Sequence, residues 1–154
     1  MDTITQVRKI FDDYLTEKRH RKTPERFTIL EEIYSRNDHF DVESLYLHLR
    51  SRSHSVSRAT VYNTIDLLLG CELIVKHQFG ENHSLFEKAY GYKQHDHLIC
   101  AECNKVFEFC DPRLAEIQNT IGKILRFEIT HHSLNLYGHC MRTSCEFKST
   151  AAAV

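Results

Sequence analysis

Cysteine is the residue type in this sequence whose spacing most directly indicates chemistry. Cys100 and Cys103 form one close pair, and Cys140 and Cys145 form a second pair downstream. Zinc prefers thiolate sulfur in a tetrahedral arrangement, and structural zinc sites fill all four positions with protein ligands. We therefore predict a structural Zn²⁺ held by these four thiolates. In peptides, structural zinc contributes on the order of 10 kcal/mol to folding, enough to support a domain with a small core.

A second kind of metal chemistry is indicated immediately before the first cysteine pair. His95 and His97 stand two apart in a segment expected to be a strand, so both imidazoles should emerge on one face. Glu108 lies on the next expected strand, where its carboxylate can join them. Nitrogen and oxygen ligands suit a divalent ion such as iron, manganese or zinc.

The other cysteines and histidines carry no comparable signal. Cys71 and Cys110 fit no pairing and are expected to be small apolar fillers. The isolated histidines are expected to be surface or satisfied core residues, and they are His20, His48, His54, His77, His83, His131 and His139.

Composition bounds the class of protein. The chain has 154 residues, enough for one ordinary domain or two small ones, with 42% hydrophobic and 27% charged residues. No apolar run approaches the ~20 residues that cross a bilayer, and charges interrupt the first helix where a secretory signal would be apolar. We expect a cytoplasmic protein with reduced thiols and no membrane partner. Because the formal net charge is −1, DNA binding would have to rest on local basic patches.

The first half of the sequence predicts helices followed by a hairpin. Apolar periodicity predicts a helix over residues 4–18, and Thr23 with Pro24 begins a second helix that ends near residues 37–38, with Glu31 and Glu32 facing solvent. Asp41 caps a third helix, and Ser57 caps a fourth, 58–69, which Gly70 ends. Strands are expected at 73–79 and 84–88, joined by a turn at 80–83. This order is that of a winged helix-turn-helix; a small helical bundle that binds nothing is the alternative.

The second half predicts a smaller α/β unit. Residues 89–93 have the composition of a hinge, and strands are expected at 95–99, 105–109 and 127–137, with a helix starting at Asp111-Pro112. Such a unit has open sheet edges and an apolar helix face, so we expect a homodimer. The predicted fold is α+β: a winged-helix domain over 1–88, a hinge at 89–93, a dimerisation and metal-binding domain over 94–148, and a disordered tail at 149–154.

Three motifs carry a resemblance to a known family. They are Ser57 to Tyr62, His95 to Cys103, and His132 to Cys140 with Cys145 behind it. Motifs of this kind in this order resemble the ferric uptake regulator family. The resemblance implies a homodimeric, metal-dependent transcription factor with an N-terminal winged helix and a C-terminal dimerisation domain.

Carried over position by position, the resemblance also implies the residues of the functional sites. The family's regulatory metal site falls on His39, Glu87, His95, His97 and Glu108. Its DNA contacts fall on Arg21, Lys22, Arg58, Thr60, Tyr62 and Asn63. Tyrosine contacts a thymine methyl and asparagine pairs with adenine, so an A/T-rich operator is chemically reasonable.

A third metal site of the family matches this sequence only in part. Asp96 and His132 match it, but Gln94 stands at its first histidine position, and Ala115, with Glu116 next to it, at its helix glutamate. The candidate set here is Asp96, His132 and Glu116.

The function implied is an Fe²⁺-dependent repressor of iron-uptake genes that binds inverted-repeat, A/T-rich double-stranded DNA as a homodimer, with Mn²⁺ or Zn²⁺ able to substitute. Within the family, a zinc-uptake regulator or a peroxide sensor is the alternative; the glutamates at positions 87 and 108 favour iron sensing, since the peroxide sensors carry aspartate there. Outside it, a structural zinc module or a zinc hydrolase is the alternative. No signature of a zinc enzyme precedes the cysteines, so we expect neither an enzyme nor a small-molecule substrate.

Overall fold

The computed structural model describes residues 2–80 and 84–143. The chain forms two compact units, residues 1–92 and 93–154, and the boundary between them falls within the segment predicted as a hinge. The two units are described in turn.

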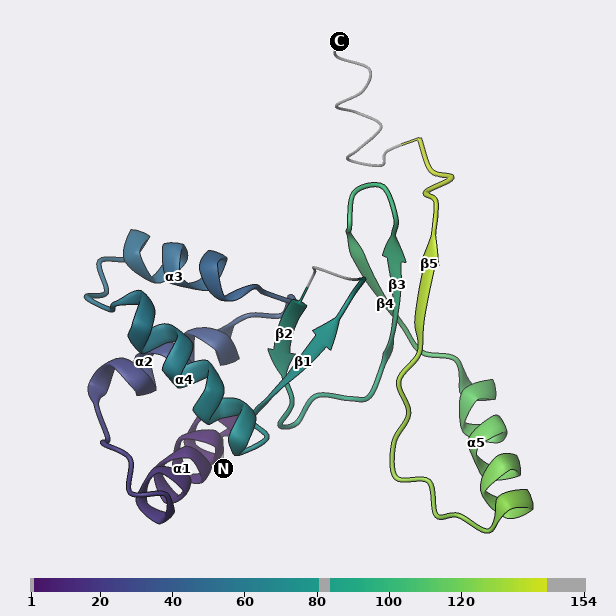
Figure 1. Ribbon diagram of the computed structural model, residues 1–154, viewed down its shortest axis with the longest axis horizontal. Coiled ribbons are helices and arrows are strands. Elements are labelled where there is room, and N and C mark those ends of the chain that lie inside the picture. Colours follow the sequence, from purple (N-terminus) through teal and green to yellow (C-terminus); the bar gives the residue numbers. More distant parts are fainter. Residues whose placement is uncertain (1, 81–83, 144–154) are drawn as a thin grey trace. The chain divides into compact units, whose positions relative to one another are not determined.

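The first unit begins with four helices. These helices are α1 (Thr3–Glu17), α2 (Pro24–Ser35), α3 (Val42–Ser51) and α4 (Arg58–Gly70), in agreement with the sequence prediction (Figure 1). Side-chain caps begin α3 and α4, whereas Thr23, the residue before α2, makes no side-chain cap hydrogen bond. The Asp41 carboxylate accepts a hydrogen bond from the Ser44 backbone N–H at 2.8 Å, and the Ser57 hydroxyl accepts one from the Thr60 N–H at 3.1 Å. Each cap satisfies a donor that the first helical turn leaves unpaired.

The core of this unit lies between the four helices and the hairpin. Its fully buried side chains come from one face of each helix, as the 3.6-residue period requires. The largest are Phe11, Leu15, Ile29, Leu30, Ile33, Leu45, Leu49, Leu68, Leu73 and Ile74. Gly70 ends α4 as predicted, but the left-handed residue that turns the chain is Glu72, with φ of 57°. The missing side chain of Gly70 makes room for the Tyr14 hydroxyl instead.

The hairpin consists of two antiparallel strands, β1 (Ile74–Gln78) and β2 (Ser84–Lys88), with Val75 opposite Glu87. Phe40 adds a short bridge on the other side of β2, because the backbones of Phe40 and Phe86 exchange hydrogen bonds of 3.0 and 2.8 Å. Gly80, with φ of 79°, starts the predicted turn. The rest of that turn lies outside the described residues.

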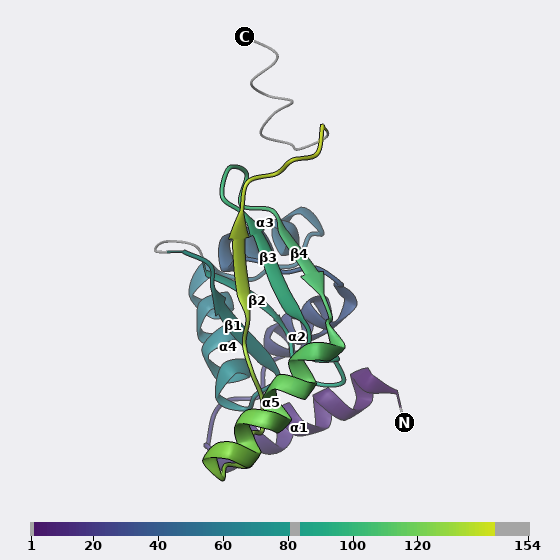
Figure 2. The same cartoon turned by 90° about the vertical axis from the view of Figure 1, so that its right-hand side faces the viewer.

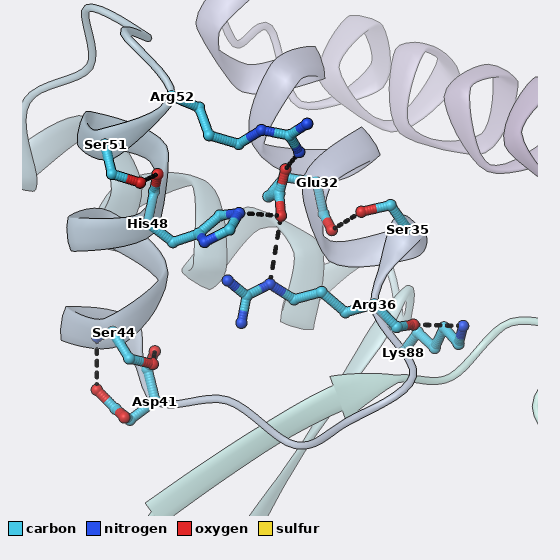
Figure 3. A network of polar contacts seen from close by, with 9 residues as sticks. All are labelled: Glu32, Ser35, Arg36, Asp41, Ser44, His48, Ser51, Arg52 and Lys88. Atoms are coloured by element: carbon cyan, nitrogen blue, oxygen red, sulfur yellow. Dashed lines mark hydrogen bonds and ion pairs between the residues drawn. The ribbon is translucent and has the colours of Figure 1, made fainter.

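Glu32 differs from its prediction, because it is only 8% exposed rather than turned toward solvent. Figure 3 shows that basic side chains from the residue after α2, from α3 and from the residue after α3 surround its carboxylate. Arg36 Nε lies 3.5 Å and His48 Nε2 3.0 Å from Oε1, while Arg52 Nη1 lies 3.3 Å from Oε2. A buried carboxylate requires such partners. The cluster therefore joins α2 to the end of α3.

The segment after β2 is tied to the first unit by its backbone. The Ala89 N–H donates to the Leu73 carbonyl at 3.0 Å, and the Tyr90 N–H donates to the Tyr34 hydroxyl at 3.3 Å. Gly91, with φ of 72°, then turns the chain. Residues 89 and 90 are therefore part of the first unit's hydrogen-bonded structure.

The second unit is a three-stranded sheet with one helix. Its elements are β3 (Asp96–Cys100), β4 (Val106–Phe109), α5 (Pro112–Leu125) and β5 (Asn135–Gly138). The strand order is β4-β3-β5, with β4 antiparallel and β5 parallel to the central β3 (Figure 2). The Asp111 carboxylate accepts a hydrogen bond from the Arg113 N–H at 3.0 Å, which begins α5 where Asp111-Pro112 predicted.

The last predicted strand, 127–137, is wrong over most of its length. Arg126, with φ of 58°, ends α5, and the Phe127 N–H donates back to the Gly122 carbonyl at 2.9 Å. The chain reaches strand geometry only at Asn135, which pairs with His97. Pairing further upstream would require β3 to start earlier, but it starts at Asp96. Residues 127–134 therefore form a connection rather than a strand.

Several large apolar side chains of this unit are exposed on α5, on β5 and at the start of the connection between them. Ile124 is 72% and Leu125 61% exposed, and Ile117, Ile121, Phe127, Leu136 and Tyr137 are exposed as well. An apolar surface of this extent on a small unit marks an interaction site. Among the described helices, none has the length and apolar character needed to cross a membrane.

Candidate functional site

A cluster of potential metal ligands lies beside the hairpin of the first unit. Antiparallel pairing of Phe40 with Phe86 sets His39 against Glu87, and β1 brings His77 to the same face as Glu87, two residues beyond the Val75 that pairs with Glu87. His39 Nε2 lies 3.2 Å from Oε2 of Glu87, and His77 Nε2 lies 2.6 Å from Oε1. The Glu87 residue is only 7% exposed. Two imidazoles thus converge on one buried carboxylate.

His77 was expected to be an isolated histidine without a metal, and sequence reasoning missed its place in this cluster. The only signal in the sequence was alternation: His77 and Val75 share a strand face, and Val75 opposes Glu87. That signal needs the register of the hairpin, which spacing alone does not supply.

A second cluster lies in the second unit, on the residues that strand spacing predicted. His97 opposes Glu108 across the β3–β4 pair, and the rings of His95 and His97 are 4.8 Å apart. His95 Nε2 lies 3.7 Å from the Glu108 carboxylate. His97 is only 2% exposed.

The tautomer of His95 is set by its backbone contact. Nδ1 lies 2.9 Å from the Lys93 carbonyl oxygen, which can only accept a hydrogen bond, so Nδ1 carries the proton. Nε2 is then the unprotonated nitrogen, the form that coordinates a metal. Each of the two clusters therefore offers two imidazoles and a carboxylate, a donor set that fits iron, manganese or zinc.

The cysteines gather at the opposite end of β3. Cys100 pairs with Gly138 in the parallel β3–β5 ladder, so Cys140 follows two residues beyond that point. Backbone N–H groups of Cys103 and Glu102 lower the pKa of the Cys100 thiol to about 7, with smaller help from the Cys103 side chain and the Cys140 backbone. A thiol with that pKa is about half ionised at pH 7, and the thiolate is the form that binds zinc. Cys145 lies outside the described residues.

The remaining cysteines differ from each other. Cys71 is half-buried, and burial raises the pKa of its thiol, as expected for a filler. Cys110 is exposed, with its sulfur 3.6 Å from the Gln94 carbonyl oxygen, so its prediction as a buried filler is wrong.

The residues of the third candidate metal site form a hydrogen-bonded group. His132 Nε2 lies 3.0 Å from the 3% exposed Asp96 carboxylate, while the Gln94 amide lies 2.9 Å from His132 Nδ1 and the Gln118 amide contacts the same nitrogen. Glu116 is exposed on α5. Both imidazole nitrogens are engaged by protein groups, and neutral amides stand where a cation needs charged or imidazole donors. This group does not fit a metal.

The predicted DNA contacts lie at and near the start of α4. Tyr62 is 48% exposed and Asn63 is exposed beside it, whereas Thr60 packs its hydroxyl 2.9 Å from that of Ser57. Arg58 forms hydrogen bonds of 2.6 to 3.1 Å with both carboxylate oxygens of Glu43, and this pairing lowers the pKa of the Glu43 carboxyl.

The basic segment before α2 is also exposed. Arg21 lies at the surface, and Lys22 pairs with Asp12 of α1 at 2.6 Å. Of the predicted contacts, Tyr62, Asn63 and Arg21 are therefore presented to solvent, whereas Arg58 and Lys22 each hold an acidic partner.

Comparison with known proteins gives a consistent picture. The ferric uptake regulation protein of Legionella pneumophila is 38% identical over 106 residues, which cover 69% of this chain and 77% of that protein. The crystal structure of the Vibrio cholerae ferric uptake regulator is 30% identical, with a TM-score of 0.70 and coverage of 84% of this chain and 98% of that one. The manganese-containing regulator from Pseudomonas aeruginosa is 29% identical, with a TM-score of 0.73 and coverage of 85% and 98%. The sequence profile of the ferric uptake regulator family matches residues 17–137, and the chain belongs to that family.

Proposed function

We propose that this protein is an iron-responsive transcriptional repressor that binds operator DNA as a homodimer when ferrous iron is plentiful. The observation that carries the proposal is the pair of imidazole and carboxylate clusters, one in each unit of a ferric uptake regulator chain. The relatives named as ferric uptake regulation proteins favour iron over zinc or peroxide as the signal. This function places the protein in the cytoplasm, where its operator lies.

The regulatory ligands of this proposal come from both units. His39 and Glu87 belong to the DNA-binding unit, and His95, His97 and Glu108 belong to the second unit. A divalent cation supplies two positive charges and directional bonds to nitrogen and oxygen donors. Ligands that share one ion are constrained in their relative orientation, and the conformations that satisfy them gain population. The two recognition helices of a dimer would then have one fixed spacing, as an inverted repeat requires.

The DNA-reading surface of this proposal is the exposed start of α4. Tyr62 and Asn63 supply the base contacts, and Arg21 supplies a phosphate or minor-groove contact. Arg58 reaches DNA only by exchanging its Glu43 partner for a phosphate. Thr60 acts by holding the helix start.

The structural zinc of this proposal is held by Cys100, Cys103, Cys140 and Cys145. It is supported by the pairing of β3 with β5, in which Cys140 lies two residues beyond Gly138, the partner of Cys100. The low pKa of the Cys100 thiol supports it as well. The exposed apolar face of α5 and β5 is the surface for the second copy of the chain, because burying it removes a large apolar area from water.

The test is anaerobic footprinting of an inverted-repeat operator with the zinc-loaded protein, titrated separately with Fe²⁺, Mn²⁺ and Zn²⁺. We expect Fe²⁺-dependent protection that a chelator reverses, and loss of protection in His97→Ala with the dimer intact. His54→Ala is the matched control, since His54 is exposed and outside both clusters. Protection that needs no added metal would contradict the proposal. Loss of protection after peroxide treatment would favour the peroxide-sensing alternative, and a response to Zn²⁺ alone would favour the zinc-uptake alternative.

A further inference from the structure

We propose that His77 completes, with His39 and Glu87, a three-ligand divalent-cation site that lies entirely within the DNA-binding unit. This inference rests on the proposed function in taking a divalent metal as the ligand. It adds a ligand that neither sequence spacing nor the family resemblance assigns, and it lets the first unit hold an ion without donors from the second.

The local β-structure alone assembles this site. Glu87 lies on β2, with the backbone of residues 39–40 bridged to one side of the strand and β1 on the other. Because side chains alternate along each strand, His39, His77 and Glu87 share one face. One donor atom from each of the three lies within 4.8 Å of the others. No motion of a separate unit is needed to bring them together.

The chemistry of the three donors fits a cation better than it fits a hydrogen-bonded group. Both imidazoles approach the carboxylate through Nε2, at 3.2 and 2.6 Å, one to each oxygen. Glu87 is 7% exposed, so its charge is costly to bury unless positive charge lies close by. Neutral imidazoles donate a hydrogen bond but carry no charge, whereas a divalent ion supplies the charge and binds the Nε2 lone pair of each ring in the tautomer that carries its proton on Nδ1.

The number of donors also matters. Two imidazoles and one carboxylate leave coordination positions open, as in the sites that hold zinc or non-haem ferrous iron with further ligands added. The three donors of the DNA-binding unit are therefore sufficient to hold an ion while leaving positions for further ligands.

The experiment removes the ligands of the second unit and measures whether the first unit still binds a metal ion. Zinc-loaded full-length protein carrying His95→Gln, His97→Gln and Glu108→Gln is titrated anaerobically with Co²⁺, whose visible absorption reports nitrogen and oxygen ligation. We expect one Co²⁺ bound per protomer. Adding His77→Gln should weaken that binding at least about tenfold, whereas adding His54→Gln should leave it unchanged. Zinc content and circular dichroism check that each variant is folded.

A second comparison avoids the triple variant. In the otherwise unaltered chain, His77→Gln should weaken Co²⁺ binding by at least about tenfold relative to His54→Gln. Equal affinities of His77→Gln and His54→Gln in this comparison would overturn the inference, as would a triple variant that is folded but binds no Co²⁺.

The outcomes also separate this inference from the proposed function. Iron-dependent operator protection by the unaltered chain, combined with no effect of His77→Gln on Co²⁺ binding, would leave the repressor standing without this site. Co²⁺ binding that depends on His77, combined with operator protection that needs no metal, would leave the site standing without the repressor.

Discussion

At the scale of single residues, a residue's place in the structure could be predicted when it followed from the spacing of residues close together in the sequence. His95, His97 and the caps Asp41 and Ser57 follow from spacing of two or three residues, and the structure places them as expected. Glu87 came from the family resemblance, because its partners lie on other segments and become neighbours only through strand register. His39 and His77 have the same dependence on register.

Glu32 shows the same limit and leads to a stability prediction. Helical periodicity placed it with Glu31 on the solvent side, but Arg36, His48 and Arg52 gather around it. Glu32→Ala leaves these basic side chains without their shared carboxylate, and we expect a loss of about 2 kcal/mol in the free energy of unfolding, discounted because two of the partners are substantially exposed. Urea denaturation measures it.

The matched control for that prediction is the neighbouring glutamate. Glu31 pairs with Arg8, and both side chains are more than two-fifths exposed. Glu31→Ala should therefore change the unfolding free energy by less than about 0.5 kcal/mol. Equal losses for the two variants would mean that the basic cluster around Glu32 contributes no more than a surface ion pair.

Cys100 gives a prediction about pH. Backbone N–H groups lower the pKa of its thiol to about 7, whereas burial raises the pKa of the Cys71 thiol above its ordinary value of 9.0. Because the folded-state pKa of Cys100 is depressed, its stabilising contribution is present above pH 9 and is lost as the pH falls through about 7. In zinc-depleted protein, alkylation of Cys100 should reach half its maximal rate near pH 7, and alkylation of Cys71 only in alkaline solution. Mass spectrometry of the labelled peptides measures both rates. A midpoint near pH 9 for Cys100 would show that the backbone N–H groups of Glu102 and Cys103 no longer donate to its sulfur once zinc is removed.

At the scale of secondary-structure elements, the helices were predictable and one strand was not. Apolar periodicity and capping are local, so α1 to α5 lie where the sequence placed them. The alternation over 127–137 suggested a long strand, but a strand needs a partner of the same length, and β3 offers pairing only from His97 onward. Phe127 is left 72% exposed and joins α5 in the apolar surface, whereas Ile129 is only 37% exposed.

The element α4 carries a prediction about operator affinity. Tyr62 is exposed and on the outer side of a helix whose buried face packs in the core, so truncating it should not affect folding. Tyr62→Ala should weaken operator binding by roughly 1–3 kcal/mol, that is about 5-fold to 150-fold, because its base contact is lost. Fluorescence anisotropy at fixed salt measures this change. Unaltered affinity would mean that α4 is not the recognition helix.

The apolar face of α5 carries a prediction about assembly. Ile124 is 72% exposed in the single chain, and the neighbouring Lys123 lies on the polar side of the helix. Ile124→Glu should leave the protomer folded but shift it to monomer, because a charge would be buried at the interface without a partner. Lys123→Glu should leave the dimer intact. Sedimentation velocity distinguishes the two, and a dimeric Ile124→Glu variant would move the interface elsewhere.

At the scale of the whole molecule, the family's architecture was predictable from the order of three motifs, but the number of metals it holds was not. Gln94 and Ala115 depart from the family's third metal site, yet only the structure adds that Gln118 turns its amide toward His132. His132 is held between this amide and Asp96, so protein groups engage both of its ring nitrogens.

That arrangement fixes an expected metal count of two ions per protomer. Mass spectrometry under native conditions should find one zinc that resists a mild chelator and one exchangeable ion that does not. Mild chelation should abolish operator binding with the dimer intact, whereas Cys100→Ser should lose the zinc and dissociate the dimer, since the second unit loses the closure that stabilises it. Gln94→His combined with Ala115→Glu supplies two donors beside Asp96 and His132 and should raise the count to three. A third ion in the unaltered chain would show that metal displaces the Gln94 and Gln118 amides from His132. It would contradict the conclusion that Asp96 and His132 form a hydrogen-bonded group without a metal.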